Sequence, residues 1–147
     1  VVTCGHSAGG QLALWLASAR QGCLVGPAAA VAQAGVCDLA AASRDRLGDG
    51  AVDALLGGDP DAVPDRYASA SPIARLPLGV PQLLVHGSAD DVVPPSQSER
   101  HAAAAGDEAE LVSVPGADHF DVIDPAHAAW GVVVDRLPRL LAQNDSV

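Results

Sequence analysis

The sequence contains no lysine, and all eight of its basic residues are arginine. Without lysine, the chain cannot form a Schiff base, a serine–lysine dyad or a lysine-dependent phosphate loop. The 18 acidic residues outnumber the basic ones and give a formal net charge of -10 at pH 7. This charge repels nucleic-acid phosphates and anionic lipids, so we expect no nucleic-acid or membrane partner and a neutral or cationic small-molecule substrate.

Long apolar runs are also absent, although 49% of the residues are hydrophobic. No run is long enough to span a bilayer, and the composition is typical of a soluble α/β domain, for which we expect a cytoplasmic location. Cysteine is scarce: Cys4, Cys23 and Cys37 follow neither a metal-binding nor a redox spacing. We therefore expect small buried side chains at these positions and no disulfide scaffold.

A strand, a sharp turn and a helix are predicted at the start of the chain. The apolar run 1–4 leads into Gly5-His6-Ser7-Ala8-Gly9, and a helical pattern follows from residue 11. This order is typical of a nucleophile elbow and predicts that Ser7 is a catalytic nucleophile. Glycine is expected at positions 5 and 9 because side chains there would collide with the strand and the helix. The Ala8 N–H is the expected donor to an oxyanion.

Two later strand candidates each end in a polar loop. The run 81–86 leads to Asp90, and the run 109–114 leads to His119. Serine, acid and histidine in this chain order predict His119 as the general base and Asp90 as the acid that orients it. Two alternatives for the acid stay open: the neighbouring Asp91, and Asp38, which follows the preceding strand and is otherwise a helix N-cap.

The remaining histidines have simpler interpretations. His6 is expected to pack or hydrogen-bond locally within the elbow, and His86 is expected to brace the acid loop. His101 and His127 are expected to be solvated helix residues. The acidic residues around His119 have no zinc-type spacing, so we expect neither a metal nor another cofactor.

With these motifs the chain resembles the α/β-hydrolase superfamily, and more narrowly the bacterial esterases and kynurenine-formamidase-like hydrolases. The resemblance rests on residues 5–10, on an HGxxDxxVP pattern at 86–94 and on a Gly-x-x-His-Phe pattern at 116–120. It implies a serine hydrolase that cleaves a carboxylic ester, an amide or a formamide through an acyl-enzyme. Prolyl-oligopeptidase-type peptidases carry similar acid and histidine loops, so a serine peptidase is an alternative. A non-catalytic hydrolase-like chain is another.

The same resemblance implies a mostly parallel sheet flanked by helices, in which the elbow follows the fifth strand. Residues 1–147 are therefore expected to be the C-terminal part of a single α/β-hydrolase domain without its N-terminal strands. The lack of methionine agrees with this expectation. The second oxyanion donor belongs to the missing part, so we expect residues 1–147 alone to be inactive or nearly so.

Apolar patterns predict the remaining elements. Strands near 1–4, 28–35, 81–86 and 109–114 are expected to be parallel, because helix-length crossovers separate them. Residues 38–80 are too long for a simple crossover and are expected to form a cap-like excursion over the active-site end, with a short helix at 51–56. A last helix is expected to start at Asp124 and Pro125. Its predicted buried stripe is Trp130, Val133, Val134, Leu137 and Leu141.

Overall fold

Within the residues that the structure describes, the sheet has four parallel strands in the order β1-β2-β3-β4. The structure is a computed structural model that describes residues 1–19 and 25–142. The strands are β1 (Val2–His6), β2 (Ala29–Gln33), β3 (Gln82–Gly87) and β4 (Ala109–Val114). The predicted strands and their parallel pairing are confirmed, although β1 continues to His6, beyond its predicted end.

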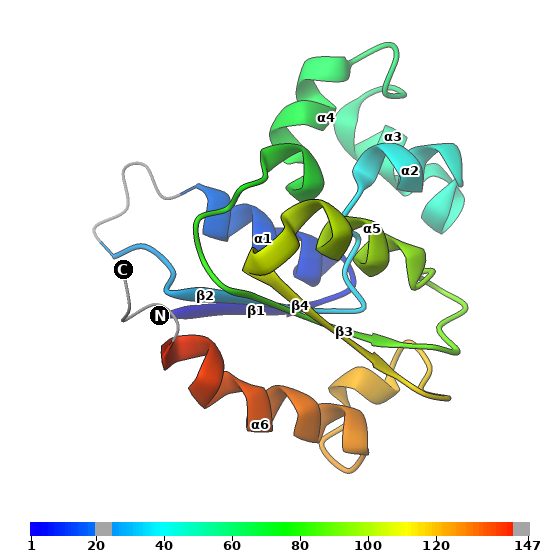
Figure 1. The fold of residues 1–147 in the computed structure, drawn as a ribbon. Coiled ribbons are helices and arrows are strands. Elements are labelled where there is room, and N and C mark those ends of the chain that lie inside the picture. The colour runs from blue at the N-terminus through cyan, green and yellow to red at the C-terminus, as the bar shows by residue number, and fades with distance from the viewer. Residues whose placement is uncertain (20–24, 143–147) are drawn as a thin grey trace.

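Helices cover both faces of this sheet (Figure 1). The helices α1 (Ala8–Ser18) and α5 (Ser96–Ala105) pack on one face, and α6 (Ala128–Ala142) packs on the other. Alternate residues of β2 point to the two faces: Ala29 and Val31 pack with the α6 side, whereas Ala30 and Ala32 pack with the α1 side. Every residue of β2 is buried. A strand covered on both faces has a continuous apolar sequence, which is why this one was predictable.

The chain between β2 and β3 forms a set of short helices, which we call the helical segment 38–80. It contains α2 (Leu39–Arg44), η1 (Leu47–Gly50), α3 (Ala51–Leu56), α4 (Pro64–Ala70) and η2 (Pro72–Arg75). Figure 1 shows α2, α3 and α4 gathered on the α1 side, away from the sheet. Two side chains of α1 bind this segment: Gln11 Nε2 donates to the Ala70 carbonyl at 2.8 Å, and Trp15 Nε1 donates to the Ser69 carbonyl at 2.9 Å.

The last helix differs from its prediction. After the short turns η3 (Gly106–Glu108) and η4 (Asp121–Ile123), α6 begins at Ala128 and not at Pro125. Asp124 closes the preceding turn instead of capping α6, since its Oδ1 accepts from the Ala126 N–H at 2.8 Å. The buried residues of α6 are Ala129, Val133 and Leu140. Val134 and Leu141 are 54% and 38% exposed, so the predicted stripe is wrong at these two positions.

Two predictions about burial are also corrected. Cys4 is exposed because β1 is the edge strand of the described sheet. Cys37 is buried as expected, and Cys23 lies outside the described residues. His101 is fully buried and not solvated, because α5 turns it toward β3, where its Nε2 lies 2.7 Å from Gln82 Oε1. Among residues 1–19 and 25–142, no helix has the length and apolar character needed to cross a membrane.

Candidate active site

Ser7 occupies the sharp turn between β1 and α1. Its backbone has φ 57° and ψ -121°, a conformation that costs a non-glycine residue about 1–3 kcal/mol. The surrounding backbone holds this turn: the Ser7 N–H donates to the Gln33 carbonyl at 2.9 Å, and the Ser7 carbonyl accepts from the Gly10 N–H at 3.0 Å. A strained serine fixed between a strand and a helix is the geometry that a nucleophile elbow requires.

The glycines around Ser7 are only partly explained by the predicted collisions. A Cβ at Gly5 would lie 2.0 Å from the Gly9 carbonyl oxygen, so glycine is required there. The prediction for Gly9 is wrong, because a Cβ at this position meets nothing within 4 Å. Gly10 has the close contact instead, since its Cβ would lie 2.8 Å from the Gly35 Cα. Gly5 of β1 lies against the carbonyl oxygen of Gly9. A side chain at Gly9 would project away from this contact.

Asp90 and His119 are hydrogen-bonded to each other. His119 Nδ1 lies 2.7 Å from Asp90 Oδ2, and both residues are buried. Asp90 Oδ1 accepts from the N–H groups of Val92 and Val93 at 2.9 and 2.8 Å. Burial alone raises the pKa of Asp90, but hydrogen bonds from His119, Val93 and Val92 outweigh it and hold this pKa below its usual value. The ionised carboxylate requires the proton on His119 Nδ1, which leaves Nε2 free to act as a base.

The loops that carry these two residues are held together by their backbones. The Ala89 N–H donates to the Ala117 carbonyl at 3.0 Å. Gly87 has no room for a side chain, because a Cβ there would lie 2.2 Å from the same carbonyl oxygen. The glycine of the acid loop therefore allows the histidine loop to approach.

The other two candidate acids have different surroundings. Asp38 is the N-cap of α2: its Oδ1 accepts from the Ala41 N–H at 3.0 Å. Its Oδ2 lies 3.3 Å from Arg100 Nε. Asp91 is exposed. Of the three candidates, Asp90 is the one that lies against His119.

His6 links the elbow to the histidine loop, a contact that the sequence did not predict. Its Nε2 donates to the His119 carbonyl at 2.8 Å, and the two ring centroids are 4.4 Å apart. Phe120 packs edge-on against the His119 ring at 5.2 Å. The contacts of the described chain include no hydrogen bond between Ser7 Oγ and His119. The His6 contact nevertheless brings His119 to the residue next to Ser7.

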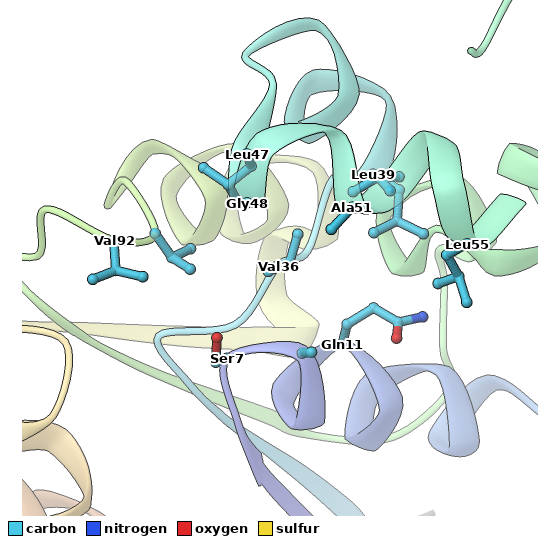
Figure 2. Close-up of a pocket in the computed structure, with 12 residues that line it drawn as sticks. Ser7, Gln11, Val36, Leu39, Leu47, Gly48, Ala51, Leu55 and Val92 are labelled. Carbon is cyan, nitrogen blue, oxygen red and sulfur yellow. The ribbon is translucent and has the colours of Figure 1, made fainter. Parts of the chain in front are cut away.

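A pocket of about 250 Å³ opens beside Ser7. Figure 2 shows the Ser7 side chain pointing from the elbow into this space, with Leu47 and Gly48 across from it. The lining carries no charged side chain and comes from the elbow and α1, the loop after β2, the helical segment 38–80 and the acid loop. Its residues are Ser7, Ala8, Gln11, Val36, Leu39, Leu47, Gly48, Ala51, Val52, Leu55, Val92 and Val93.

Ala8 is also the first residue of α1. The N–H groups of the first helical turn have no acceptor within the helix, so the Ala8 N–H is available to an oxyanion. In the described ranges, no three histidine, cysteine, aspartate or glutamate side chains are arranged to hold a metal ion.

Most of the chain is similar to proteins of a known family. The model of the prolyl oligopeptidase family matches residues 1–131. Over 79 residues the chain is 37% identical to an uncharacterised protein of Mycobacterium tuberculosis, a match that covers 54% of this chain and 26% of that protein. The chain thus spans about a quarter of the length of this curated relative.

Two solved structures share the fold. A puromycin-hydrolyzing peptidase of Mycobacterium tuberculosis is 30% identical with a TM-score of 0.67, over 96% of this chain and 21% of that chain. A truncated carbohydrate esterase from gut microbiota is 24% identical with a TM-score of 0.71, over 95% of this chain and 59% of that chain. The described sheet and helices therefore correspond to part of the α/β-hydrolase fold of these longer proteins.

Proposed function

Because the chain belongs to the prolyl oligopeptidase family, we propose that it is a serine hydrolase in which Ser7 attacks the carbonyl carbon of the substrate. His119 is the general base, Asp90 orients its imidazole, and the Ala8 N–H donates to the oxyanion. One observation carries the proposal: the strained Ser7 lies beside an apolar pocket. The buried hydrogen bond between His119 and Asp90 supports it.

The proposed reaction proceeds through an acyl-enzyme. His119 Nε2 takes the Ser7 proton as Oγ attacks the carbonyl carbon, and Asp90 stabilises the resulting imidazolium. The negative charge on the carbonyl oxygen is stabilised by the Ala8 N–H. The tetrahedral intermediate then expels the leaving group, which receives the proton from His119. Water activated by the same histidine releases the acyl group, so the cycle needs no cofactor.

Catalytic hydrogen bonds are often long in ligand-free sites and tighten when the substrate binds. The proposal therefore requires His119 Nε2 to approach Ser7 Oγ in the substrate complex. The His6 contact supports this, because it already holds the His119 loop against the elbow.

The pocket supports a proposal for the group that the substrate carries next to its carbonyl. Its volume of about 250 Å³ is below the roughly 300–1,000 Å³ of sites that enclose a whole small ligand. It therefore accommodates one substituent, which must be uncharged and apolar because the lining carries no charged side chain. The 30% identical relative is a peptidase. We therefore propose an amide substrate with an apolar residue on the acyl side.

Paired substrates test this proposal. The whole protein that carries residues 1–147, its Ser7→Ala variant and the control variant Ser69→Ala are assayed with leucine p-nitroanilide, an amide, and with p-nitrophenyl butyrate, an ester. Ser69 is an exposed serine whose hydroxyl donates to the Arg66 carbonyl. We expect turnover of both substrates by wild type and Ser69→Ala, and a loss on the order of 10⁶-fold in kcat for Ser7→Ala.

The other outcomes separate the alternatives. Turnover of the ester alone would contradict the amide substrate and favour the esterase interpretation. Turnover that survives in Ser7→Ala would place the nucleophile elsewhere. A folded wild-type protein that turns over neither substrate would favour the non-catalytic alternative.

A further inference from the structure

His86 is a buried histidine behind the candidate acid. It lies near the end of β3 and is 1% exposed. Its Nδ1 lies 2.7 Å from the Ser98 hydroxyl, and its Nε2 lies 2.9 Å from the Val93 carbonyl oxygen and 3.2 Å from Asp90 Oδ2. Both ring nitrogens are therefore engaged, one by α5 and the other by the acid loop.

The partners of His86 determine its tautomer. The Val93 carbonyl can only accept a hydrogen bond, and so can the ionised Asp90 carboxylate. A proton on Nε2 is donated to the Val93 carbonyl and also faces Asp90 Oδ2, whereas a lone pair there would face the lone pairs of both oxygens. The Ser98 hydroxyl then donates to the unprotonated Nδ1. Ser98 thus favours the tautomer of His86 that donates to the Val93 carbonyl and faces Asp90 with its N–H.

Together these contacts hold the Asp90 carboxylate at both oxygens. Oδ2 lies between His119 Nδ1 at 2.7 Å and His86 Nε2 at 3.2 Å. Oδ1 accepts from the Val92 and Val93 N–H groups. A rotation of the carboxylate would break several buried hydrogen bonds. Catalytic groups must be held within about 0.5 Å of the productive geometry. Residues that fix the position of Asp90 therefore affect the rate of the reaction.

We propose that His86 and Ser98 are positioning residues for the catalytic acid: Ser98 sets the tautomer of His86, and His86 Nε2–H holds Asp90 in line with His119. The inference rests on the proposed function, because it assigns to Asp90 the role of orienting the general base. Neither His86 nor Ser98 lines the pocket beside Ser7, so both act on the chemical step through Asp90 and not by binding the substrate.

His101 provides a matched control in the same layer. It is also a buried histidine at the interface of α5 and β3, and its Nε2 lies 2.7 Å from Gln82 Oε1. Gln82 is the first residue of β3, whereas His86 is near its last. Replacing His101 therefore has the general cost of altering a buried histidine without touching Asp90.

The test compares the variants His86→Met, His86→Gln, Ser98→Ala and His101→Met in the whole protein that carries residues 1–147. We measure kcat and KM with p-nitrophenyl butyrate, the rate of labelling by a fluorophosphonate probe, and thermal unfolding. His86→Met is expected to lower kcat and the labelling rate about 10- to 100-fold, because it removes the N–H that binds the Val93 carbonyl and faces the Asp90 carboxylate, with KM nearly unchanged. His86→Gln is expected to recover most of kcat, because its amide can donate toward Asp90. The kcat of Ser98→Ala is expected to lie between those of His86→Met and His86→Gln. His101→Met is expected to keep the wild-type kcat.

Contrary results are equally specific. Wild-type kcat in His86→Met, or an equal loss of kcat in His101→Met, would overturn the positioning role. If His86→Met does not fold, the comparison of Ser98→Ala with His101→Met decides, and wild-type kcat in Ser98→Ala overturns the proposal. If the probe fails to label the folded wild type, the proposed function fails as well. If it labels wild type and His86→Met at the same rate, only the positioning role fails.

Discussion

Asp90 is buried and remains ionised because several hydrogen-bond donors surround its carboxylate. The Val92 and Val93 amides donate to one oxygen, and His119 lies against the other. Its pKa is lowered in the folded chain, so the stability that it contributes is present above the unfolded pKa of about 3.9. This contribution is lost as the pH falls through the lower folded pKa. Asp90 therefore remains ionised at neutral pH.

His101 also makes acidification destabilising, in a higher pH range than Asp90 does. Burial lowers its pKa to about 4, whereas an unfolded histidine has a pKa of about 6.5. Between these values the unfolded state binds more protons, so the free energy of unfolding falls as the pH decreases. From pH 7 to pH 4 we expect wild type to lose up to about 3 kcal/mol more than His101→Met. Urea unfolding at a series of pH values measures this difference. Parallel pH profiles for the two proteins would contradict it.

At the scale of elements, the start of α1 packs closely against the chain that follows β2, and which of its two glycines makes this contact matters. A Cβ at Gly10 would lie 2.8 Å from the Gly35 Cα, whereas a Cβ at Gly9 meets nothing within 4 Å. Gly10→Ala is therefore expected to destabilise the fold by about 1–3 kcal/mol. Gly9→Ala is expected to be neutral or to stabilise it by up to about 1 kcal/mol, because alanine favours the helix. Thermal unfolding of the two variants tests this. A greater loss of stability in Gly9→Ala would show that the packing at the elbow is different.

The helix α3 contributes Leu55 to the rim of the pocket. Leu55 is 75% exposed and still lines the space beside Ser7. Leu55→Glu is expected to lower kcat/KM for leucine p-nitroanilide about tenfold, since a carboxylate replaces an apolar contact of the substrate. Its stability is expected to change by less than about 0.5 kcal/mol. Val134→Glu is the control, because Val134 is 54% exposed on α6. An equal loss of kcat/KM in both variants would contradict a role of α3 in substrate binding.

The sequence predicted the elements whose surroundings are uniform. β2 is buried along its whole length, so its apolar run was sufficient. In α6, apolar residues occur on more than one face, and only packing against β2 and β3 selects Val133 over Val134. The burial of His101 depends equally on a partner, Gln82, that is distant in the sequence.

The candidate site shows the same division. Ser7, Asp90 and His119 each follow the end of a strand in a parallel sheet. Their order along the chain was therefore enough to predict them as candidate catalytic residues. The pocket could not be predicted, because its lining comes from segments that only the fold brings together. The contact of His6 with His119 joins residues 113 positions apart, and no local pattern indicates it.

At the scale of the whole molecule, the net charge of -10 at pH 7 affects how substrates approach. A negative surface attracts cations over about 30 Å at 0.01 M ionic strength and over about 8 Å at 0.15 M. We expect a thiocholine ester to have a higher kcat/KM than the uncharged thioester of the same acid at low salt. The ratio is expected to fall as salt is added. A ratio that does not depend on salt would contradict electrostatic steering.

The central claim is that this chain carries an activated serine at position 7, and active-site labelling tests it most directly. The folded protein is treated with a fluorophosphonate probe, and the modified residue is identified by mass spectrometry of its peptides. The account predicts one adduct, on Ser7, that is lost in Ser7→Ala and that forms far more slowly in His119→Ala. No adduct on Ser7 in the folded wild type, or labelling at an unchanged rate in His119→Ala, would contradict the account.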